Sequence, residues 1–163
     1  MSLSLFVFIG LNVATAMSGA VFKPGDWYDS LTKPPWQPPK WAFPVAWTLF
    51  YAMIAVAGWL VWTAAGTQGT LFAFALYGVQ LLLNAGWSGV FFGMRKMRLA
   101  LWEVGALWLS IAATILAFLP HSQGAALLMV PYLAWVSFAA FLNWTMIRLN
   151  PDQADGPALA EAG

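Results

Sequence analysis

The chain has no cysteine and carries charge on only 8% of its 163 residues. Without cysteine, disulfide bonds, thiolate metal sites and thiol chemistry are all excluded. A soluble domain has about 25% charged residues, so a chain with this few cannot cover a water-exposed surface with polar groups. The net charge of +1 and the absence of a basic stripe outside the connecting loops predict no nucleic-acid partner. The shortage of charge therefore indicates an integral membrane protein.

Long apolar runs make up most of what is present, and hydrophobic residues account for 61% of the chain. A membrane-spanning helix needs about 20 consecutive apolar residues. Five segments meet this requirement, namely residues 3–22, 42–65, 70–92, 99–119 and 125–147. Short connections between them force consecutive helices to be antiparallel neighbours. The sequence thus predicts an all-α integral membrane protein, a five-transmembrane-helix bundle over residues 1–150, followed by a flexible tail at residues 151–163.

All the basic residues fall on one side of such a bundle. They lie in the first connection, in and beside the third connection, and after the fifth span: Lys23, Lys33, Lys40, Arg95, Lys96, Arg98 and Arg148. Since positive charge is retained in the cytoplasm, we expect the loop at residues 23–41 and the C-terminus to be cytoplasmic and the N-terminus to lie outside, in a bacterial cell membrane. Ala14-Thr15-Ala16 resembles a signal-peptide cleavage site, but no positive charge precedes the apolar stretch, so we interpret residues 3–22 as a span.

The connection at residues 23–41 is rich in tryptophan and proline. From Trp27 to Trp47 the sequence reads WYDSLTKPPWQPPKWAFPVAW. A proline-dense segment cannot be a helix interior, because each ring removes a backbone donor and clashes with the preceding turn. We therefore predict a semi-rigid aromatic lid over one end of the bundle, suited to capture of a flat, apolar ligand.

Three of the predicted spans carry aromatic and amide side chains at helical spacing. These faces are Trp47, Tyr51, Ile54 and Gly58 in the second span, Tyr77, Gln80, Asn84 and Trp87 in the third, and Trp135, Phe138, Ala139, Leu142 and Asn143 in the fifth. If the faces converge beneath the lid, they form a slot with indole walls and few polar groups, the usual form of a small-molecule site. The alternative is structural. Aromatic residues then act as packing or interface anchors, and the amides hydrogen-bond between helices.

Other polar residues are weaker candidates. Glu103 lies near a cytoplasmic helix end, where pairing with Arg98 or Lys96 is a simpler role than a proton relay. His121 stands in a short outer connection without partner ligands, so we expect no metal site. The sequence also lacks a Ser/His/Asp set and a carboxylate pair. Small residues recur every four positions at Gly10, Ala14 and Ser18 and at Ala85, Gly89 and Gly93, which suits close helix contact within the monomer or across a homodimer.

Several of these stretches together resemble the tryptophan-rich sensory protein and translocator protein family, also called the peripheral benzodiazepine receptor family. The matching pattern is WYDSLTKPPWQPP followed by FPVAW in the second span, LNAGW leading into FFGMR in the third, and PYLAW running on to LNW in the fifth. The resemblance covers nearly the whole chain in order. It implies a five-helix membrane bundle, often dimeric, with a pocket that opens toward the loop after the first helix.

The resemblance also implies ligands and site residues. Members of the family bind porphyrins such as protoporphyrin IX and haem, as well as isoquinoline carboxamides, and no cofactor is required. Some bacterial members are similar to light-dependent porphyrin-degrading enzymes in which two pocket tryptophans matter, and those positions match Trp47 and Trp135 here. Other matching pocket positions are Trp27, Trp36, Tyr51, Asn84, Trp87 and Ala139, to which the helical faces add Phe138 and Asn143.

One motif departs from the animal members of that family. Their proposed sterol motif places Leu or Val, then Tyr, then Lys or Arg near the C-terminus, whereas this chain has Leu142, Trp144 and Arg148. That motif is weak even when complete, so we do not expect strong cholesterol binding. The leading hypothesis is a tetrapyrrole-binding membrane protein that senses, moves or photo-degrades porphyrins. The alternatives are a transporter of tetrapyrroles or lipids, and a stress-responsive interaction protein without chemistry.

Overall fold

The computed structural model describes residues 3–156, and within that range the chain forms helices and no strand. The five long helices are α1 (Leu3–Val21), α3 (Ala42–Ala65), α4 (Leu71–Ser88), α5 (Met97–Phe118) and α6 (Gln123–Leu149). α4 continues directly into a π-helical turn, η1 (Gly89–Gly93). Each long helix, with α4 and η1 taken together, is long and apolar enough to cross a membrane. The predicted fold class is confirmed, and the predicted spans agree with these bounds to within two residues at either end.

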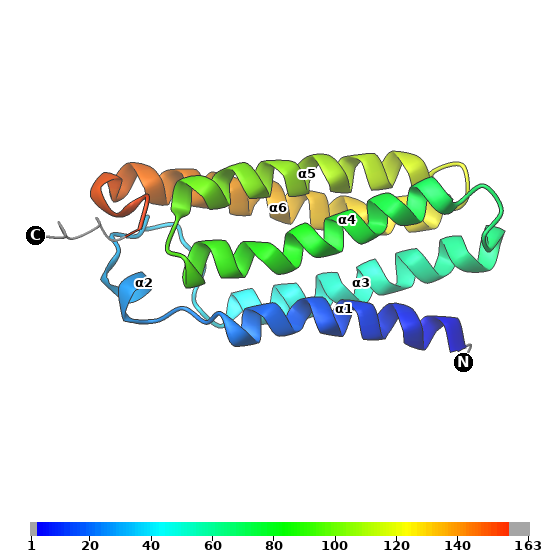
Figure 1. Ribbon diagram of the computed structural model, residues 1–163, viewed down its shortest axis with the longest axis horizontal. Coiled ribbons are helices and arrows are strands. Elements are labelled where there is room, and N and C mark those ends of the chain that lie inside the picture. Colours follow the sequence, from blue (N-terminus) through cyan, green and yellow to red (C-terminus); the bar gives the residue numbers. More distant parts are fainter. Residues whose placement is uncertain (1–2, 157–163) are drawn as a thin grey trace, which may run out of the picture.

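The long helices lie side by side along the length of the molecule (Figure 1). Helix α1 packs against α3, α3 against α6, α6 against α5, α5 against α4, and α4 against α1. These contacts close into a ring of five helices, so the bundle has an interior that every long helix borders. In a bilayer the lipid is as apolar as these helices, so the ring is held by close side-chain packing and by hydrogen bonds between helices.

Two glycines let aromatic rings approach the helix backbone. A Cβ atom at Gly58 of α3 would lie 2.7 Å from the Phe8 ring of α1, so only a residue without a side chain fits there. A Cβ atom at Gly93 would lie 2.9 Å from the Phe22 ring, which also covers Gly89 at 3.4 Å. Two members of the small-residue row at Ala85, Gly89 and Gly93 are therefore used within the monomer. The homodimer stays a prediction.

The chain after α6 folds back onto the bundle. A 3-10 turn, η2 (Pro151–Gln153), follows α6, and Ala154 is fully buried among residues of α5, α6 and the first loop. Arg98 at the start of α5 forms an ion pair with Asp155, which fixes the chain at this point. The tail predicted for residues 151–163 therefore differs from the structure at residues 151–156, because a buried side chain and an ion pair offset the entropy of ordering them. Residues 157–163 lie outside the described range.

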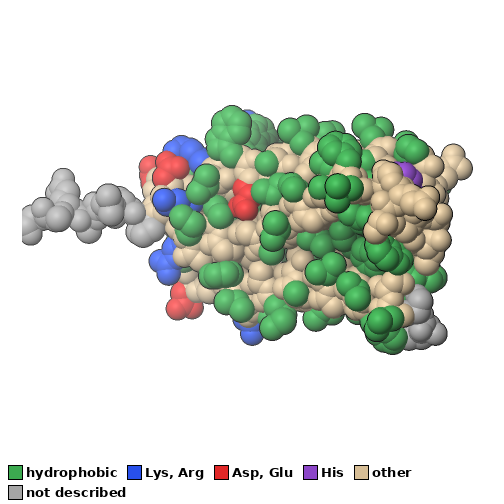
Figure 2. Space-filling view, turned by 45° about the vertical axis from the view of Figure 1, so that its right-hand side comes forward, with side chains coloured by type: hydrophobic (Ala, Val, Ile, Leu, Met, Phe, Trp, Pro, Cys, Tyr) green, Lys and Arg blue, Asp and Glu red, His purple; other side chains and the backbone are tan. Residues whose placement is uncertain are grey.

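The outer surface is apolar along the length of the bundle, and Lys and Arg side chains gather toward one end (Figure 2). Trp102, Leu82 and Leu109 are among the large apolar residues that point outward, with 81%, 75% and 65% of their surface exposed. Such a surface requires a lipid environment, because a soluble protein of this size does not expose apolar side chains along its whole flank. The loop at residues 23–41 and the C-terminal turn lie together at the charged end (Figure 1).

Candidate functional site

A cavity of about 590 Å³ lies at the end of the bundle beneath the loop at residues 23–41. Its walls come from all five long helices and η1, and Tyr28, Gln37 and Lys40 of the loop complete the lining. Most of the lining is apolar. The volume falls in the range of about 300–1,000 Å³ that is typical of small-molecule sites.

Two tryptophans from different helices form part of the cavity wall. Trp47 of α3 stacks on Tyr51, with ring centroids 5.6 Å apart. Trp135 of α6 packs against Phe50 at 5.6 Å and against Phe138 at 5.4 Å. Both indoles are half-buried and both line the cavity. The aromatic neighbours hold each indole plane in place, so the wall is formed before any ligand arrives.

The π-helical turn η1 adds two more rings to the wall. The Met94 N–H donates to the Gly89 carbonyl, five residues back, at 2.8 Å. Phe91 and Phe92 both line the cavity, and Trp87 stacks on Phe91 at a centroid distance of 4.9 Å. Neighbouring side chains on a regular helix diverge by about 100°, and a π turn changes that direction locally. Single π turns within helices often occur at functional sites.

A chain of hydrogen bonds joins three helices at the base of the cavity. Tyr51 Oη donates to Asn84 Oδ1 at 2.7 Å, and Asn84 Nδ2 donates to Tyr132 Oη at 2.6 Å. Tyr132 Oη in turn donates to Gln80 Oε1 at 3.1 Å. Tyr51 and Asn84 line the cavity, whereas Tyr132 and Gln80 lie fully buried behind them. The chain therefore links α3, α4 and α6, and it presents one phenol and one amide to the cavity.

Two indole N–H groups of the wall have no partner. Trp87 Nε1 and Trp135 Nε1 are buried and make no hydrogen bond in the structure. A buried donor without a partner is costly, and such exceptions call for an explanation. Both residues line the cavity, but neither nitrogen has accessible surface, so the indole rings and not their N–H groups face the ligand space.

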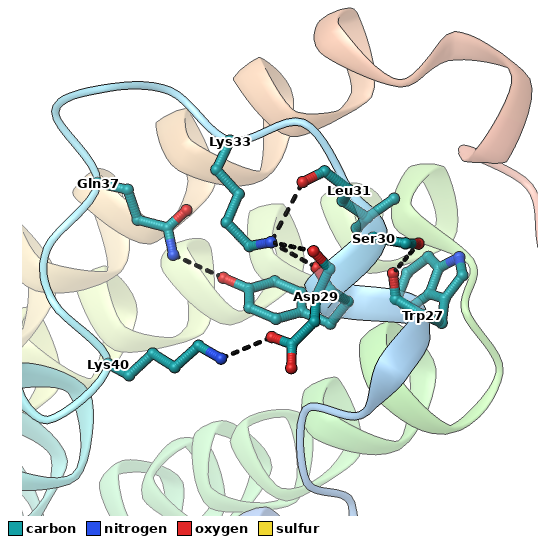
Figure 3. A network of polar contacts seen from close by, with 8 residues as sticks. Trp27, Asp29, Ser30, Leu31, Lys33, Gln37 and Lys40 are labelled. Carbon is teal, nitrogen blue, oxygen red and sulfur yellow. Dashed lines mark hydrogen bonds and ion pairs between the residues drawn. The ribbon is translucent and has the colours of Figure 1, made fainter.

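The loop is held in a defined shape by its own side chains (Figure 3). It contains a short helix, α2 (Asp26–Ser30), and Lys33 Nζ donates to three carbonyls of residues 28–31 at distances between 2.7 and 3.2 Å. Gln37 Nε2 donates to Tyr28 Oη at 2.8 Å, and Lys40 Nζ pairs with Asp29 Oδ1 at 2.6 Å. These bonds connect α2 to the proline-rich segment that follows it. The loop is therefore a folded lid.

The electrostatics of the lid follow from the same contacts. The hydrogen bond and charge of Lys40 lower the pKa of the Asp29 carboxyl below its ordinary value of 3.8. The same pair raises the pKa of the Lys40 ammonium, so both groups are charged at neutral pH. Burial raises the pKa of the Tyr28 phenol, which stays protonated. At its far side the lid is fixed to the end of α6, because the Asn150 amide bonds the backbone N–H and carbonyl of Thr32 at 2.8 and 2.9 Å.

Most residues predicted for the site lie together in the structure. The cavity lining contains Trp47, Trp135, Tyr51, Asn84, Trp87, Ala139 and Asn143. Asn143 also has a structural contact, since the orientation that satisfies both ends of its amide donates to the Met97 carbonyl at 3.2 Å and accepts from the Leu101 N–H at 3.1 Å. The predicted faces of α3, α4 and α6 thus contribute side chains to one cavity beneath the lid. The amides of Asn84 and Asn143 also form hydrogen bonds between helices.

Three predicted residues lie outside the cavity lining. Trp36 stacks on Phe141 at 5.3 Å on the outside of α6 and is 43% exposed. Phe138 contacts Trp36 at 6.0 Å, and Trp27 packs against Phe91 at 6.0 Å from behind. In this structure, Trp27, Trp36 and Phe138 therefore support the wall and lid from outside. Phe138 directly precedes Ala139, so its side chain points to a different side of the helix.

The sequence analysis missed several lining residues. From α1 they are Ala16, Gly19 and Ala20, followed by Phe22 and Lys23, and from the lid they are Tyr28, Gln37 and Lys40. The small residues Ala16, Gly19 and Ala20 form a low wall of the cavity, and they differ from Gly10, Ala14 and Ser18, the row that the sequence indicates for helix contact. The lysines were read only as topology signals. Nothing in the sequence near Gly89 indicated the π turn.

Glu103, the acidic residue within a span, does not form the ion pair predicted for it. Glu103 was expected to pair with Arg98 or Lys96, but Arg98 pairs with Asp155, because the chain after α6 folds back. The Glu103 side chain instead lies against α4, where its Oε1 occupies the space that a Cβ atom at Gly86 would need, and its Oε2 makes no hydrogen bond. Within residues 3–156, no three His, Asp or Glu side chains are grouped so as to hold a metal ion.

Comparisons with known proteins agree with this architecture. The sequence model of the TspO/MBR family matches residues 4–149. The chain is 42% identical over 159 residues to the tryptophan-rich sensory protein of Cereibacter sphaeroides, which covers 97% of this chain and 99% of that protein. It is 42% identical over 153 residues to the tryptophan-rich protein TspO of Chlorobaculum tepidum, covering 91% and 97% of the two chains. It is 37% identical over 137 residues to the human translocator protein, covering 83% and 81%.

Proposed function

The chain belongs to the TspO/MBR family of multi-pass membrane proteins, and from this premise we propose that it binds tetrapyrroles such as protoporphyrin IX and haem in the cavity beneath its lid. The family resemblance predicted from the sequence motifs is confirmed. Membership supports a sensory or translocator role in a membrane, and the names of the related proteins are those of sensory and translocator proteins. The finer proposal rests on the site itself.

The observation that carries the proposal is the pre-formed aromatic cavity. Indole and phenyl faces from α3, α4, η1 and α6 surround about 590 Å³ of mainly apolar space. Flat macrocycles stack on such faces, and rings held in place by neighbours lose little entropy on binding. The Tyr51 phenol and the Asn84 amide, which line the cavity, offer polar contacts to a ligand edge. Isoquinoline carboxamides, which are also flat and carry one carbonyl acceptor, suit the same features.

Degradation of the bound porphyrin is the chemical part of the proposal. Photoexcited protoporphyrin accepts an electron from a stacked indole, and dioxygen adds to the porphyrin radical anion. Return of one electron from this adduct to the indole radical cation restores the tryptophan, so the net change is addition of dioxygen to the macrocycle, which needs light and air and no metal. Trp47 and Trp135 line the cavity on two different helices, which suits contact with a macrocycle from more than one side. The other predicted ligand contacts that line the cavity are Tyr51, Asn84, Trp87, Ala139 and Asn143.

The interior beyond the cavity favours binding over transport. Ile54, Ile111, Met129 and Tyr132 have no exposed surface and fill the bundle below the site. A porphyrin would need these helices to separate before it reached the opposite side. We therefore rank the tetrapyrrole or lipid transporter, and the stress-responsive interaction protein, behind a sensor or degrading protein.

The topology and partners follow from the same proposal. The basic residues gather at the lid end, so the lid and the C-terminus face the cytoplasm of a bacterial cell and the N-terminus lies outside. Membrane lipids surround the apolar flank, and sterols are weak ligands at most. A homodimer forms through small residues that the monomer leaves exposed, such as Gly10 and Ala14 of α1.

Titration of the purified protein with protoporphyrin IX tests the binding proposal. We expect saturable quenching of tryptophan fluorescence, since the indoles of Trp47, Trp87 and Trp135 line the site. The variant Ala139→Trp, which fills the cavity from α6, should lose the quenching while keeping its thermal unfolding. Trp102→Phe is the matched control because Trp102 is 81% exposed on the outside of the bundle. Absence of quenching in the wild-type protein contradicts the proposal.

A further inference from the structure

The charged residues that line the cavity are all cationic. Lys23, at the end of α1, and Lys40, at the end of the lid, border it, and among residues 3–156 no carboxylate does. Lys23 has no ion pair or hydrogen bond among the described residues, whereas Lys40 is paired with Asp29. Asp29 itself lies outside the lining. The mouth of an otherwise apolar site thus offers two ammonium groups to whatever enters.

The ion pair between Lys40 and Asp29 is exposed, so Lys40 can exchange Asp29 for another carboxylate at little cost. Its atoms are 2.6 Å apart, yet 71% of the Lys40 side chain and 52% of the Asp29 side chain remain exposed. Exposed ion pairs contribute little stability, because water and salt screen them and two long side chains must be ordered. Replacing one carboxylate partner of Lys40 by another leaves the number of charges and their hydration almost unchanged.

Lys33 shows the contrasting arrangement in the same loop. Its ammonium donates to three backbone carbonyls and lies 4.8 Å from the centre of the Tyr28 ring. These contacts cap the end of α2 and leave no donor for a ligand (Figure 3). The remaining bond between α2 and the proline-rich segment is that of Gln37 with Tyr28. Lys40 is therefore the lid cation that is both at the cavity and free to change partners.

We propose that Lys40 is an exchangeable clasp, which holds Asp29 in the empty protein and binds a carboxylate of the ligand in the occupied one. Lys23 takes up a second carboxylate at the same mouth. Release of Asp29 leaves the Gln37–Tyr28 hydrogen bond as the link between α2 and the segment at residues 34–40, so the lid loosens when the site fills with an acid and stays closed with a neutral ligand of the same shape. The inference rests on the proposed function, because it names the carboxylate edge of a planar ligand as the feature that the site recognises.

Competition for Lys40 and a simple charge effect predict the same direction for each single variant, and the double variant distinguishes them. Asp29 and the ligand carboxylate compete for one ammonium group, so opening the clasp and binding the acid favour each other by linkage. Loss of Asp29 must therefore tighten the binding of an acid, and loss of Lys40 must weaken it. Asp29 acts only through Lys40, so removing both must give the affinity of the Lys40 variant alone.

The test compares protoporphyrin IX, a dicarboxylic acid, with its uncharged dimethyl ester, by fluorescence titration at neutral pH. We expect Lys40→Gln to weaken binding of the acid by about twofold to fivefold, and Asp29→Asn to strengthen it by a similar factor, as an exposed ion pair allows. Neither variant should change binding of the ester. The double variant should match Lys40→Gln.

Two matched controls separate the clasp from general electrostatics. Asp26→Asn removes the same charge from the same short helix, and no ion pair involves Asp26 among the described residues. Lys96→Gln removes a cation from the same end of the bundle but outside the cavity lining. The clasp is overturned if Asp26→Asn and Asp29→Asn have equal effects, or if the ester responds to Lys40→Gln as the acid does.

A second measurement reads the lid directly. The chain has no cysteine, so Ser30→Cys on α2 and Pro39→Cys on the proline-rich segment carry two spin labels and no others. We expect the distance distribution between them to broaden with the acid and to stay narrow with the ester. An unchanged distribution with the acid overturns the lid release. If wild-type protein binds neither compound, the proposed function itself fails, whereas equal binding by every variant removes only the clasp.

Discussion

The phenol of Tyr51 on α3 donates a hydrogen bond of 2.7 Å to the amide oxygen of Asn84 on α4, and both residues line the cavity. The amide nitrogen of Asn84 donates a second hydrogen bond, of 2.6 Å, to the phenol oxygen of Tyr132 on α6. One amide thus holds three helices in register at the level where the site begins. The same side chain is part of the cavity lining and part of the fold.

Asn84→Leu should weaken the bundle at this point. The change removes two hydrogen bonds between helices, each worth about 0.6 kcal/mol in membrane proteins and about 1.7 kcal/mol at most. We expect the free energy of unfolding in detergent to fall by about 1–2 kcal/mol. Tyr51→Phe removes only the first bond and should cost about half as much. A fully stable Asn84→Leu protein would show that the hydrogen-bond chain carries no stability.

The variants Gly58→Ala and Gly78→Ala together test the close contact between α1 and α3. A Cβ atom at Gly58 would meet the Phe8 ring at 2.7 Å, whereas one at Gly78 has no atom within 4 Å. Overpacking costs about 1–3 kcal/mol, so Gly58→Ala should lower the melting temperature. Gly78→Ala should leave it unchanged or raise it, since alanine favours a helix by about 1 kcal/mol over glycine. Equal melting temperatures of the two variants contradict the contact between α1 and α3.

The five long helices were predictable because an apolar run of this length is stable only as a helix that crosses a membrane. Runs of this length need a bilayer, and short joints predict that consecutive helices are antiparallel neighbours. That prediction holds for α4 with α5 and for α5 with α6, but it is wrong for α3 and α4, which are not neighbours in the ring although only residues 66–70 join them. Trp47, Tyr51, Asn84 and Trp135 were predictable for a related reason, since helical spacing puts them on faces that the ring of helices turns inward. The resemblance to a known family then added which of these faces meet.

The rest depended on contacts that spacing does not encode. Trp36 lies in a proline-rich loop, where no helical periodicity predicts the direction of a side chain. Its direction follows from stacking on Phe141 of α6. The π turn after Ser88 brings both Phe91 and Phe92 to the cavity, against the expectation for adjacent helical residues. The fold-back of residues 151–156 depends on the Arg98–Asp155 ion pair, which joins positions far apart in the sequence.

Acid should loosen the lid through Asp29. Its folded-state pKa lies below the ordinary value of 3.8, mainly because of the hydrogen bond from Lys40. A carboxylate with a depressed pKa contributes stability above its unfolded-state pKa, and this contribution is lost as the pH falls through the lower folded-state value. Spin labels at Ser30→Cys and Pro39→Cys should therefore show a narrow distance at neutral pH and a broad one below the ordinary pKa of Asp29.

Asp29→Asn supplies the control for this pH dependence. An asparagine cannot titrate, so this variant should show the same distance distribution across the acid range. Asp26→Asn keeps Asp29 and should follow the wild-type protein. A pH response that persists in Asp29→Asn would assign the change to another carboxyl group.

Illumination with protoporphyrin IX in air separates catalysis from binding. Phenylalanine keeps an aromatic face but is a far poorer electron donor than indole, so Trp47→Phe and Trp135→Phe should bind porphyrin and bleach it more slowly. We expect the double variant to bleach porphyrin no faster than the protein-free solution does. Trp102→Phe removes an indole that is 81% exposed on the outer surface and should match the wild-type rate. Equal bleaching by wild type and double variant would leave a binding protein whose photochemistry belongs to the porphyrin alone, since the two indoles at the cavity would then donate no electron.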